Sequence, residues 1–227
     1  MRQPAVDYRK LRLKNIGSPE YSHLKLLLGW PVYFALYFLT ENLIPAERCT
    51  PVHIWLDDLI PFNEWFLIPY VFWYGLIVFS LGWFLLYNVD SFRRLQTYII
   101  ITQLTAMAIY ILFPSRQDLR PEVFPRDNFL TDCVAFLYSV DTNTGVCPSL
   151  HVAYSLGIAS VWGKEQGVCK AGKGFILLSV ILICLSTMFI KQHSAADFFA
   201  ALPVCMLAEG IVYGRDYWKP RLKEKYA

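Results

Sequence analysis

Charged residues are scarce in this chain of 227 residues. They make up 17% of it, whereas soluble domains contain about a quarter. This shortage argues against a soluble globular protein. The sequence also has no internal repeat, no low-complexity run and no linker long enough to separate two domains, so we predict one domain over 1–227. The net charge is only +3, which gives no indication of a nucleic-acid partner.

The N-terminal sequence does not predict a removable signal peptide. More than twenty N-terminal residues are polar and basic, with no apolar core followed by a small-residue cleavage site. We therefore expect the first apolar run to serve as the insertion signal.

What the chain has in abundance is apolar surface: 56% of its residues are hydrophobic and 16% are aromatic. These residues gather in blocks, several of which approach the ~20 residues that a helix needs to span a ~30 Å hydrocarbon layer. The blocks predict an all-α fold, a bundle of six transmembrane helices over residues 24–44, 66–87, 97–113, 149–163, 173–190 and 194–213. An outer-loop segment would join helices three and four. The segment 53–64 is too short and too acidic to cross, and is expected to form an interfacial or re-entrant turn.

The basic residues fix the expected orientation. Sixteen lysines and arginines fall in the N-terminal arm, loop 88–96, loop 164–173 and the tail, and five fall on the opposite side. Because basic residues in short loops favour the cytoplasmic side, both termini are predicted to be cytoplasmic. Three cysteines then lie on the outer side, and a disulfide is possible there in an oxidising compartment, with Cys133–Cys147 the favoured pair over one using Cys49.

The chain has only four histidines, and two of them stand where a polar loop meets an apolar run. His193 precedes Asp197 by four residues, so on a helix both share one face. The carboxylate could then fix the tautomer of the imidazole and raise its basicity. The alternative is that Ser194 and Asp197 form only a capping box at a helix start, beside an ordinary interfacial histidine.

His151 follows Pro148 and Ser149, a pair that is typical of the first turn of a helix. The free backbone N–H groups and the Ser149 hydroxyl at such a helix start would attract an anion, phosphate especially. His151 would sit one turn inside the helix, near that anion. The alternative is an ordinary helix start with a buried histidine.

Three cations are expected at the same outer level. Arg116 and Arg120 are four residues apart just beyond the third span, and guanidinium groups match phosphate oxygens in bidentate fashion. Lys191 lies two residues before His193. Taken singly, these are solvated loop arginines and an interface anchor. Together with both histidines and Asp197 they indicate one phosphate-handling site at the outer ends of spans three to six.

These residues resemble the type-2 phosphatidic acid phosphatase superfamily, whose pattern is K-x6-RP, PSGH and SR-x5-H-x3-D on a six-helix membrane core. Arg120-Pro121 matches the end of the first motif, and Pro148 to His151 matches the second with leucine for glycine. Ser186 to Asp197 matches the third. The resemblance covers 97–213, the expected catalytic core. The PSLH and KQH runs resemble a branch that is related to inositol phosphorylceramide synthases.

Two residues depart from the family pattern. Phe113 stands where its first motif has lysine, and Thr187 where its third motif has arginine. Both family residues hold phosphate. We hypothesise that Arg116 and Lys191 supply the missing charge, in which case Arg116→Ala or Lys191→Ala would impair turnover about as much as Arg120→Ala.

The resemblance implies a metal-independent mechanism. His193 would attack phosphorus, Asp197 would orient it, and His151 would protonate the leaving oxygen. Arg120, Arg116, Lys191 and the Ser149 amide region would hold the phosphate oxygens. The same two histidines with Asp197 are also able to ligate zinc, but the cations favour an anion. No cofactor is expected.

The expected function is therefore hydrolysis of a lipid phosphomonoester or a polyprenyl diphosphate at the extracytoplasmic face, in a bacterial plasma membrane by resemblance to the branch. A phosphotransferase that passes the headgroup phosphate to an acceptor lipid hydroxyl would use the same residues. A non-catalytic lipid transporter is the third alternative. Aromatic residues near that face would either line a lipid opening or form an interfacial belt: Trp65, Phe66, Tyr70 and Trp73.

Overall fold

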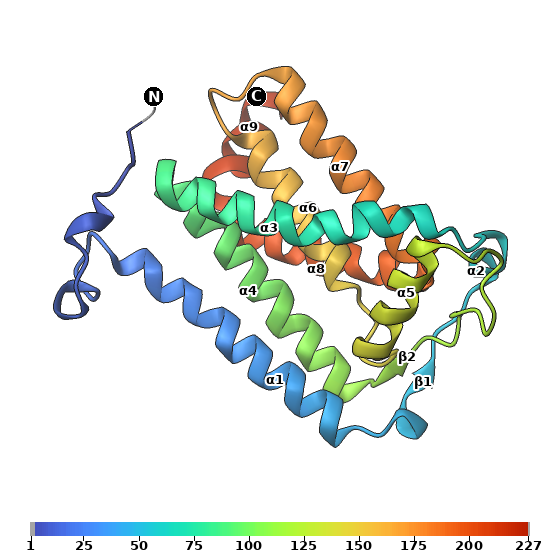
Figure 1. Cartoon of the computed structure of the whole chain (residues 1–227). Helices are drawn as coiled ribbons and strands as arrows, with labels where there is room; N and C mark the ends of the chain where they lie inside the picture. The colour runs from blue at the N-terminus through green and yellow to red at the C-terminus, as the bar shows by residue number, and fades with distance from the viewer. Residues whose placement is uncertain (1–2, 227) are drawn as a thin grey trace.

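Helices dominate the structure. The computed structural model describes residues 3–226, and its six longest helices form one bundle (Figure 1): α1 Gly29–Leu43, α3 Leu67–Tyr87, α4 Val89–Leu112, α6 Leu150–Lys164, α7 Lys170–Phe189 and α8 Ala195–Tyr213. Shorter helices are α2 Trp55–Leu59, α5 Phe129–Val140 and α9 Lys219–Tyr226. Two-residue strands, β1 Thr50–Pro51 and β2 Ser115–Arg116, pair in parallel. Five 3₁₀ segments and one π segment complete the described part: Tyr8–Lys10, Leu13–Asn15, Ser22–Leu28, Ala46–Arg48, Glu64–Phe66 and Gly214–Trp218.

Helix α6 is the centre of the bundle. It packs against α4, α7 and α8, and also contacts α3. Its apolar side chains are buried on several sides, as expected of a helix that is hydrophobic all round. Gly157 lets α4 approach closely, because a Cβ there would meet the ring of Tyr98 at 2.6 Å. This fifteen-residue helix therefore packs inside the bundle.

Four helical segments in the described residues are long and apolar enough to cross a membrane. They are Glu64–Tyr87, Val89–Leu112, Lys170–Phe189 and Ala195–Leu222. This confirms the coarse prediction of an all-helical protein and indicates a membrane protein. Helices α1 and α6 have fifteen residues each, about 22 Å of helix, so six spans remain a prediction.

Two boundaries differ from the sequence prediction. Residues 89–96, expected in an inner loop, form the first two turns of α4, because the Asn88 side chain caps the helix by accepting the N–H of Ser91. The outer segment between α4 and α6 contains an unpredicted helix, α5. Asn128 caps it by accepting the N–H groups of Leu130 and Thr131.

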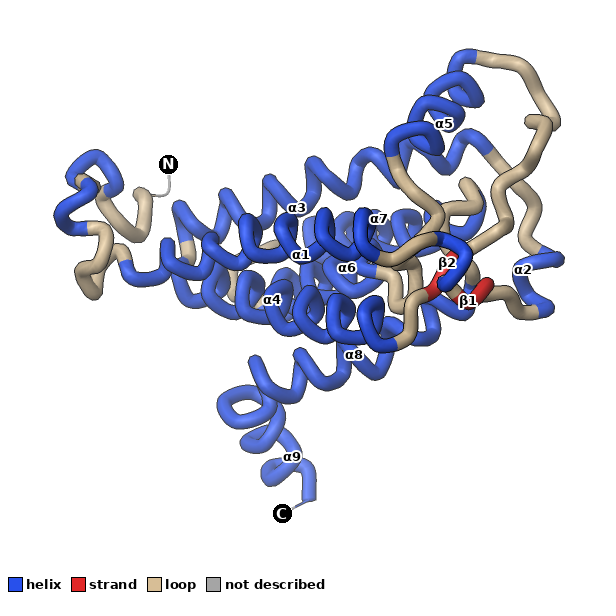
Figure 2. Tube along the Cα trace, turned by 90° about the horizontal axis from the view of Figure 1, so that it is seen from below, coloured by secondary structure: helices blue, strands red, loops and turns tan. Residues whose placement is uncertain are grey.

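The two ends of the bundle differ in what they contain. Both described termini lie toward one end, and α2, α5, β1 and β2 lie at the other, as Figures 1 and 2 agree. Segment 53–64 contributes α2 to this second end. All six cysteines are free thiols, so the possible Cys133–Cys147 bridge is not formed.

Candidate active site

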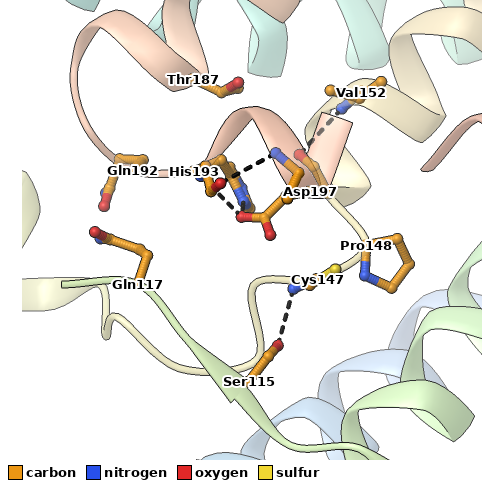
Figure 3. A network of polar contacts seen from close by, with 12 residues as sticks. Ser115, Gln117, Cys147, Pro148, Val152, Thr187, Gln192, His193 and Asp197 are labelled. Atoms are coloured by element: carbon orange, nitrogen blue, oxygen red, sulfur yellow. Dashed lines mark hydrogen bonds and ion pairs between the residues drawn. The ribbon is translucent and has the colours of Figure 1, made fainter. Parts of the chain in front are cut away.

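His193 and Asp197 are joined by a short turn at the second end of the bundle. Helix α7 ends at Phe189, and α8 begins at Ala195 with Ser194 as its N-cap. His193 Nδ1 lies 3.1 Å from Asp197 Oδ2, and the Ser194 N–H donates to the same oxygen over 3.0 Å (Figure 3). Asp197 is fully buried and His193 is 8% exposed. The two interpretations of this segment therefore coexist: the capping box forms, and its carboxylate also holds the imidazole.

His151 faces His193 from another helix. It is the second residue of α6, and its ring centroid lies 5.6 Å from that of His193. Tyr70 stacks on the His151 ring with 4.6 Å between the ring centroids, and the Trp73 ring centroid lies 4.0 Å from that of His151. Its Nε2 is buried and has no hydrogen-bond partner in the described part of the chain. The structure thus brings the two predicted imidazoles together, and α3 fixes the plane of one of them.

Both histidines line one cavity of about 630 Å³. Aromatic side chains of α1 and α3 form most of its wall: Trp30, Tyr33, Phe34, Tyr37, Trp73 and Tyr74. Its polar side chains come from loops that join helices, among them Asp141, Thr142 and Gln192. A volume of this size is within the range of small-molecule sites. The cavity therefore offers an apolar wall on one side and two imidazoles on the other.

Arg120 lies behind this cavity and does not line it. Its guanidinium donates to the carbonyl oxygens of Tyr138, Asp141 and Thr142 and to Gln192 Oε1, the last over 2.6 Å. It also lies over the Tyr138 ring, 4.5 Å from the centroid. Burial holds the pKa of Arg120 below its usual value. The fork of the guanidinium thus fixes the loop after α5 against the turn before α8.

The other two predicted cations bond away from the cavity. Arg116 Nε lies 3.1 Å from Asp118 Oδ2, and its Nη1 donates to the carbonyl oxygen of Ala46. The Lys191 ammonium donates to the carbonyl oxygens of Asp57, over 3.0 Å, and Ile60. Neither side chain lines the cavity. Their predicted phosphate contacts stay a prediction, and the contacts that they make are structural.

Ser149 differs from its expected position. It was expected to face outward in the first helical turn after Pro148, but it is fully buried as the N-cap of α6. Its hydroxyl accepts the Val152 N–H, and its own N–H donates to the Asp197 carbonyl oxygen over 3.1 Å. The cap moves the helix start to Leu150, so Pro148 precedes the helix and His151 lies inside its first turn. Ser149 joins the two histidine-bearing segments.

Asp57 is a site residue that sequence reasoning missed. Its carboxylate accepts the Ser194 hydroxyl over 2.6 Å and the Ala195 N–H over 2.7 Å. The side chain is buried and holds the first turn of α8 from a segment that is 137 residues away in sequence. Its signal was the acidic pair in 53–64, which the sequence analysis used only to exclude a span.

Asp141 and Gln192 were also missed. Gln192 Nε2 donates to Asp141 Oδ2 over 3.1 Å, while Gln192 Oε1 accepts from Arg120. Burial raises the pKa of Asp141, and the positive charges of His193 and Arg120 oppose this. Gln192 lies in the KQH run, but its contacts were not predicted, because the partners of both residues come from separate loops.

The four aromatic residues expected near a lipid opening divide into two kinds. Tyr70 and Trp73 are buried beside His151, and Trp73 lines the cavity. Phe66 stacks on Phe189 at 4.3 Å, and Trp65 is 64% exposed. Only Trp73 thus has the predicted place in the wall.

The residues that differ from the family pattern contribute no charge here. Phe113 is 72% exposed, and the buried Thr187 hydroxyl donates to the Cys184 carbonyl oxygen over 2.9 Å. The described residues also hold no group of three His, Cys, Asp or Glu side chains placed to bind a metal ion.

Comparison of the chain with protein-family models, curated proteins and solved structures gives no match.

Proposed function

We propose that this protein is an integral membrane phosphatase that cleaves a lipid phosphate ester through a phosphohistidine. The main support is that His151 and His193 line one cavity, with ring centroids 5.6 Å apart, and that Asp197 bonds to His193. A nucleophile, an orienting carboxylate and a second imidazole are the three groups that covalent phosphoryl transfer needs. Similarity to the type-2 phosphatidic acid phosphatase motifs supports the same assignment.

In the first step, His193 attacks phosphorus through Nε2, because Nδ1 is bonded to Asp197. The N–P bond forms as the P–O bond to the leaving alcohol breaks. His151 in its protonated form donates a proton from Nε2 to the leaving oxygen, and that nitrogen has no hydrogen-bond partner among residues 3–226. Asp197 stabilises the positive charge that develops on His193.

In the second step, water attacks the phosphorus of the phosphohistidine and His151 accepts its proton. The N–P bond breaks, which releases phosphate and restores both imidazoles to their starting states. The α6 helix start, where Leu150 and His151 line the cavity, places the positive end of a helix dipole beside the phosphate. Proton transfer by His151, as acid in the first step and as base in the second, contributes on the order of 10²–10⁴-fold in rate.

The substrate would be a lipid because the cavity joins both environments. Its imidazole side suits a phosphate, and its aromatic wall on α1 and α3 suits a hydrocarbon chain. We further propose six spans in a bacterial plasma membrane, with both termini cytoplasmic and the cavity toward the extracytoplasmic side. The lysine and arginine distribution supports this orientation.

Transfer of the phosphate-bearing headgroup to an acceptor lipid is the second candidate. Asp141 favours it, because a carboxylate that lines the same cavity as both imidazoles is able to accept a hydrogen bond from an acceptor hydroxyl. In that reaction the alcohol oxygen replaces water in the second step. Comparing free phosphate release with and without an alcohol acceptor separates the two fates.

The test is a phosphate-release screen of the purified protein against phosphatidic acid, phosphatidylglycerophosphate, polyprenyl diphosphates and sphingoid phosphates. His193→Ala is expected to lower turnover about 10³-fold or more, and His151→Ala about 10²–10⁴-fold. An acid-labile, base-stable phosphoprotein should accumulate in the parent and be missing in His193→Ala.

The matched control is His53→Ala. His53 belongs to the same end of the bundle, is exposed, and bonds to Asp58 outside the cavity. It should turn over lipid at the parent rate. Lipid transport that survives His193→Ala, without turnover in the parent, would instead favour a transporter.

A further inference from the structure

The charge inside the cavity is unusual for a site that handles phosphate. Among the described residues that line it, Asp141 is a carboxylate and none is lysine or arginine. The other ionisable side chains in this described lining are the two imidazoles and five tyrosine phenols, and Asp197 bonds to His193. A phosphomonoester bears a charge of about −1.5 to −2 at pH 7, and a like charge nearby disfavours such an anion.

The nearby cations do not offset this carboxylate at the phosphate. Arg120 does not line the cavity. Its Nη1 and Nη2 groups donate to three backbone carbonyls and Gln192, and its buried Nε has no partner among the described residues. Phe113 and Thr187 stand at the two positions where the resembling pattern has cations. The positive charge that is available to a bound phosphate therefore comes from the histidines and the helix start.

Asp141 is held in place. Gln192 Nε2 donates to its Oδ2, and Arg120 fixes both the Gln192 amide and the Asp141 carbonyl oxygen. The loop therefore keeps the carboxylate at the cavity wall. Its electrostatic neighbours are His193 and Arg120, which favour the ionised form, and Glu41. Glu41 lies close by, where it accepts the hydroxyls of Thr142 and Thr144.

The ring hydroxyls around Asp141 complete this description. Tyr33 and Tyr37 of α1 and Tyr74 of α3 line the same cavity as Asp141. Tyr70 of α3 lies behind His151. None of these groups brings a positive charge to the cavity at neutral pH. The packing around Asp141 thus combines one imidazole and one shielded guanidinium with neutral phenols and a second carboxylate.

We infer that the cavity selects a phosphate group with a single negative charge, and that Asp141 is the residue that sets this selectivity. This inference rests on the proposed function and narrows its substrate class. A phosphodiester meets the requirement at both pH values of the test below, because it has no second ionisation. A monoester meets it when its second ionisation, near pH 6, is suppressed. A diphosphate, with more charge, is the poorest substrate.

The test compares three lipids with the same diacylglycerol: phosphatidic acid, the phosphodiester phosphatidylglycerol, and diacylglycerol pyrophosphate. Cleavage of each by the full-length purified protein is followed at pH 5.5 and pH 8. The variants are Asp141→Asn, which keeps the acceptor for Gln192, and Asp141→Glu, which keeps the charge. Glu122→Gln is the matched control, because it removes an exposed carboxylate from the same outer segment.

In the parent we expect kcat/KM for phosphatidic acid to fall on the order of tenfold from pH 5.5 to pH 8, while that for the phosphodiester changes little. Asp141→Asn should raise kcat/KM for the monoester at pH 8 on the order of tenfold relative to the diester. Asp141→Glu and Glu122→Gln should keep the parent preference. An equal change for all three lipids in Asp141→Asn would overturn the inference.

A binding measurement separates this inference from the proposed function. Inorganic phosphate is a dianion at pH 8, and its binding can be measured without any turnover. The binding is followed by ³¹P line broadening. Asp141→Asn should bind it about tenfold more tightly than the parent and Glu122→Gln. Tighter binding without lipid cleavage in any variant would leave the charge selection standing and refute the phosphatase. Cleavage with unchanged phosphate binding would do the reverse.

Discussion

At the scale of single residues, Asp197 has two tasks. Its Oδ2 accepts the Ser194 N–H as part of the α8 cap and also holds His193 Nδ1. An amide oxygen at this position is able to keep the cap, but its neutral group no longer stabilises the charge on the imidazole. The two tasks are therefore separable by substitution.

The first prediction concerns this separation. Asp197→Asn should fold with nearly the parent melting temperature and lose about 10³–10⁴-fold in kcat. Asp197→Ala should lose activity and also about 1 kcal/mol of stability, because the cap is gone. Thermal unfolding in detergent and the phosphate-release rate measure the two effects. Equal stability losses in both variants would contradict the assignment.

The second prediction follows from the raised pKa of Asp141. A carboxyl whose folded pKa is above its unfolded value of 3.8 contributes stability that is complete below pH 3.8 and is lost as pH rises through the folded pKa. The parent should therefore lose stability relative to Asp141→Asn above pH 4. The difference in melting temperature between the two proteins, followed from pH 4 to pH 8, measures this. A difference that is independent of pH would contradict it.

The third prediction concerns the cations. Arg120 serves four acceptors in two loops, so Arg120→Ala should lower kcat/KM about 100-fold and Arg120→Lys should rescue little, since one ammonium cannot replace the planar fork. Arg116 contacts only Asp118 and Ala46 through its guanidinium. Near-parent turnover in both Arg116→Ala and Lys191→Ala would refute the hypothesis that these residues replace the missing charges.

At the scale of elements, the turn between α7 and α8 is the part on which the geometry depends. Lys191 has a φ of 55°, a left-handed conformation that costs a non-glycine residue about 1–2 kcal/mol. Its ammonium bonds to carbonyls of the α2 segment. Asp57 of α2 binds the first turn of α8. The short helix α2 thus holds the histidine-bearing turn from outside the bundle.

The fourth prediction tests this clamp. Asp57→Ala leaves the buried Ser194 hydroxyl and Ala195 N–H without their acceptor, and should cost about 2–4 kcal/mol of unfolding free energy. Turnover should fall together with the stability, because His193 lies in the turn that Asp57 holds in place. Denaturant unfolding in mild detergent measures the first effect. The control is Asp58→Ala, whose carboxylate is exposed and bonds to His53; if it destabilises the protein as much, the clamp is not the cause.

At the scale of the whole molecule, both described termini lie toward one end of the bundle, and α2, α5, β1 and β2 lie at the other. The basic residues predict that the first end is cytoplasmic. Two of the six bundle helices are only fifteen residues long. Helix α6 is enclosed by its neighbours, so it can be shorter than the hydrocarbon layer is thick. Helix α1, in contrast, has exposed apolar residues along its length.

The fifth prediction is the orientation itself. A green fluorescent protein fused after Ala227 should fluoresce, because it folds in the cytoplasm, while alkaline phosphatase at the same place should be inactive. Fusions placed in the α5 segment, after Arg126, should give the opposite result. An active phosphatase fusion at the C-terminus would invert the topology and put the cavity on the cytoplasmic side.

The sequence by itself determined the six long helices of the bundle, their approximate limits and the pairing of His193 with Asp197, but it did not indicate α5. Block hydrophobicity and a four-residue spacing are local properties, and local properties are readable along a chain. The same holds for the capping box at Ser194. Where a side-chain cap decided the boundary, as at Asn88 and Ser149, the prediction was off by one to eight residues.

Only the tertiary structure decided which groups share the cavity. Asp57 and Asp141 reach the histidine turn from other segments, and their partners are fifty or more residues away in sequence. Arg116 and Lys191 have the charge that the pattern called for, but their nearest acceptors draw them elsewhere. A buried polar group bonds to whatever acceptor the packing brings within reach, and no spacing in the sequence specifies that neighbour.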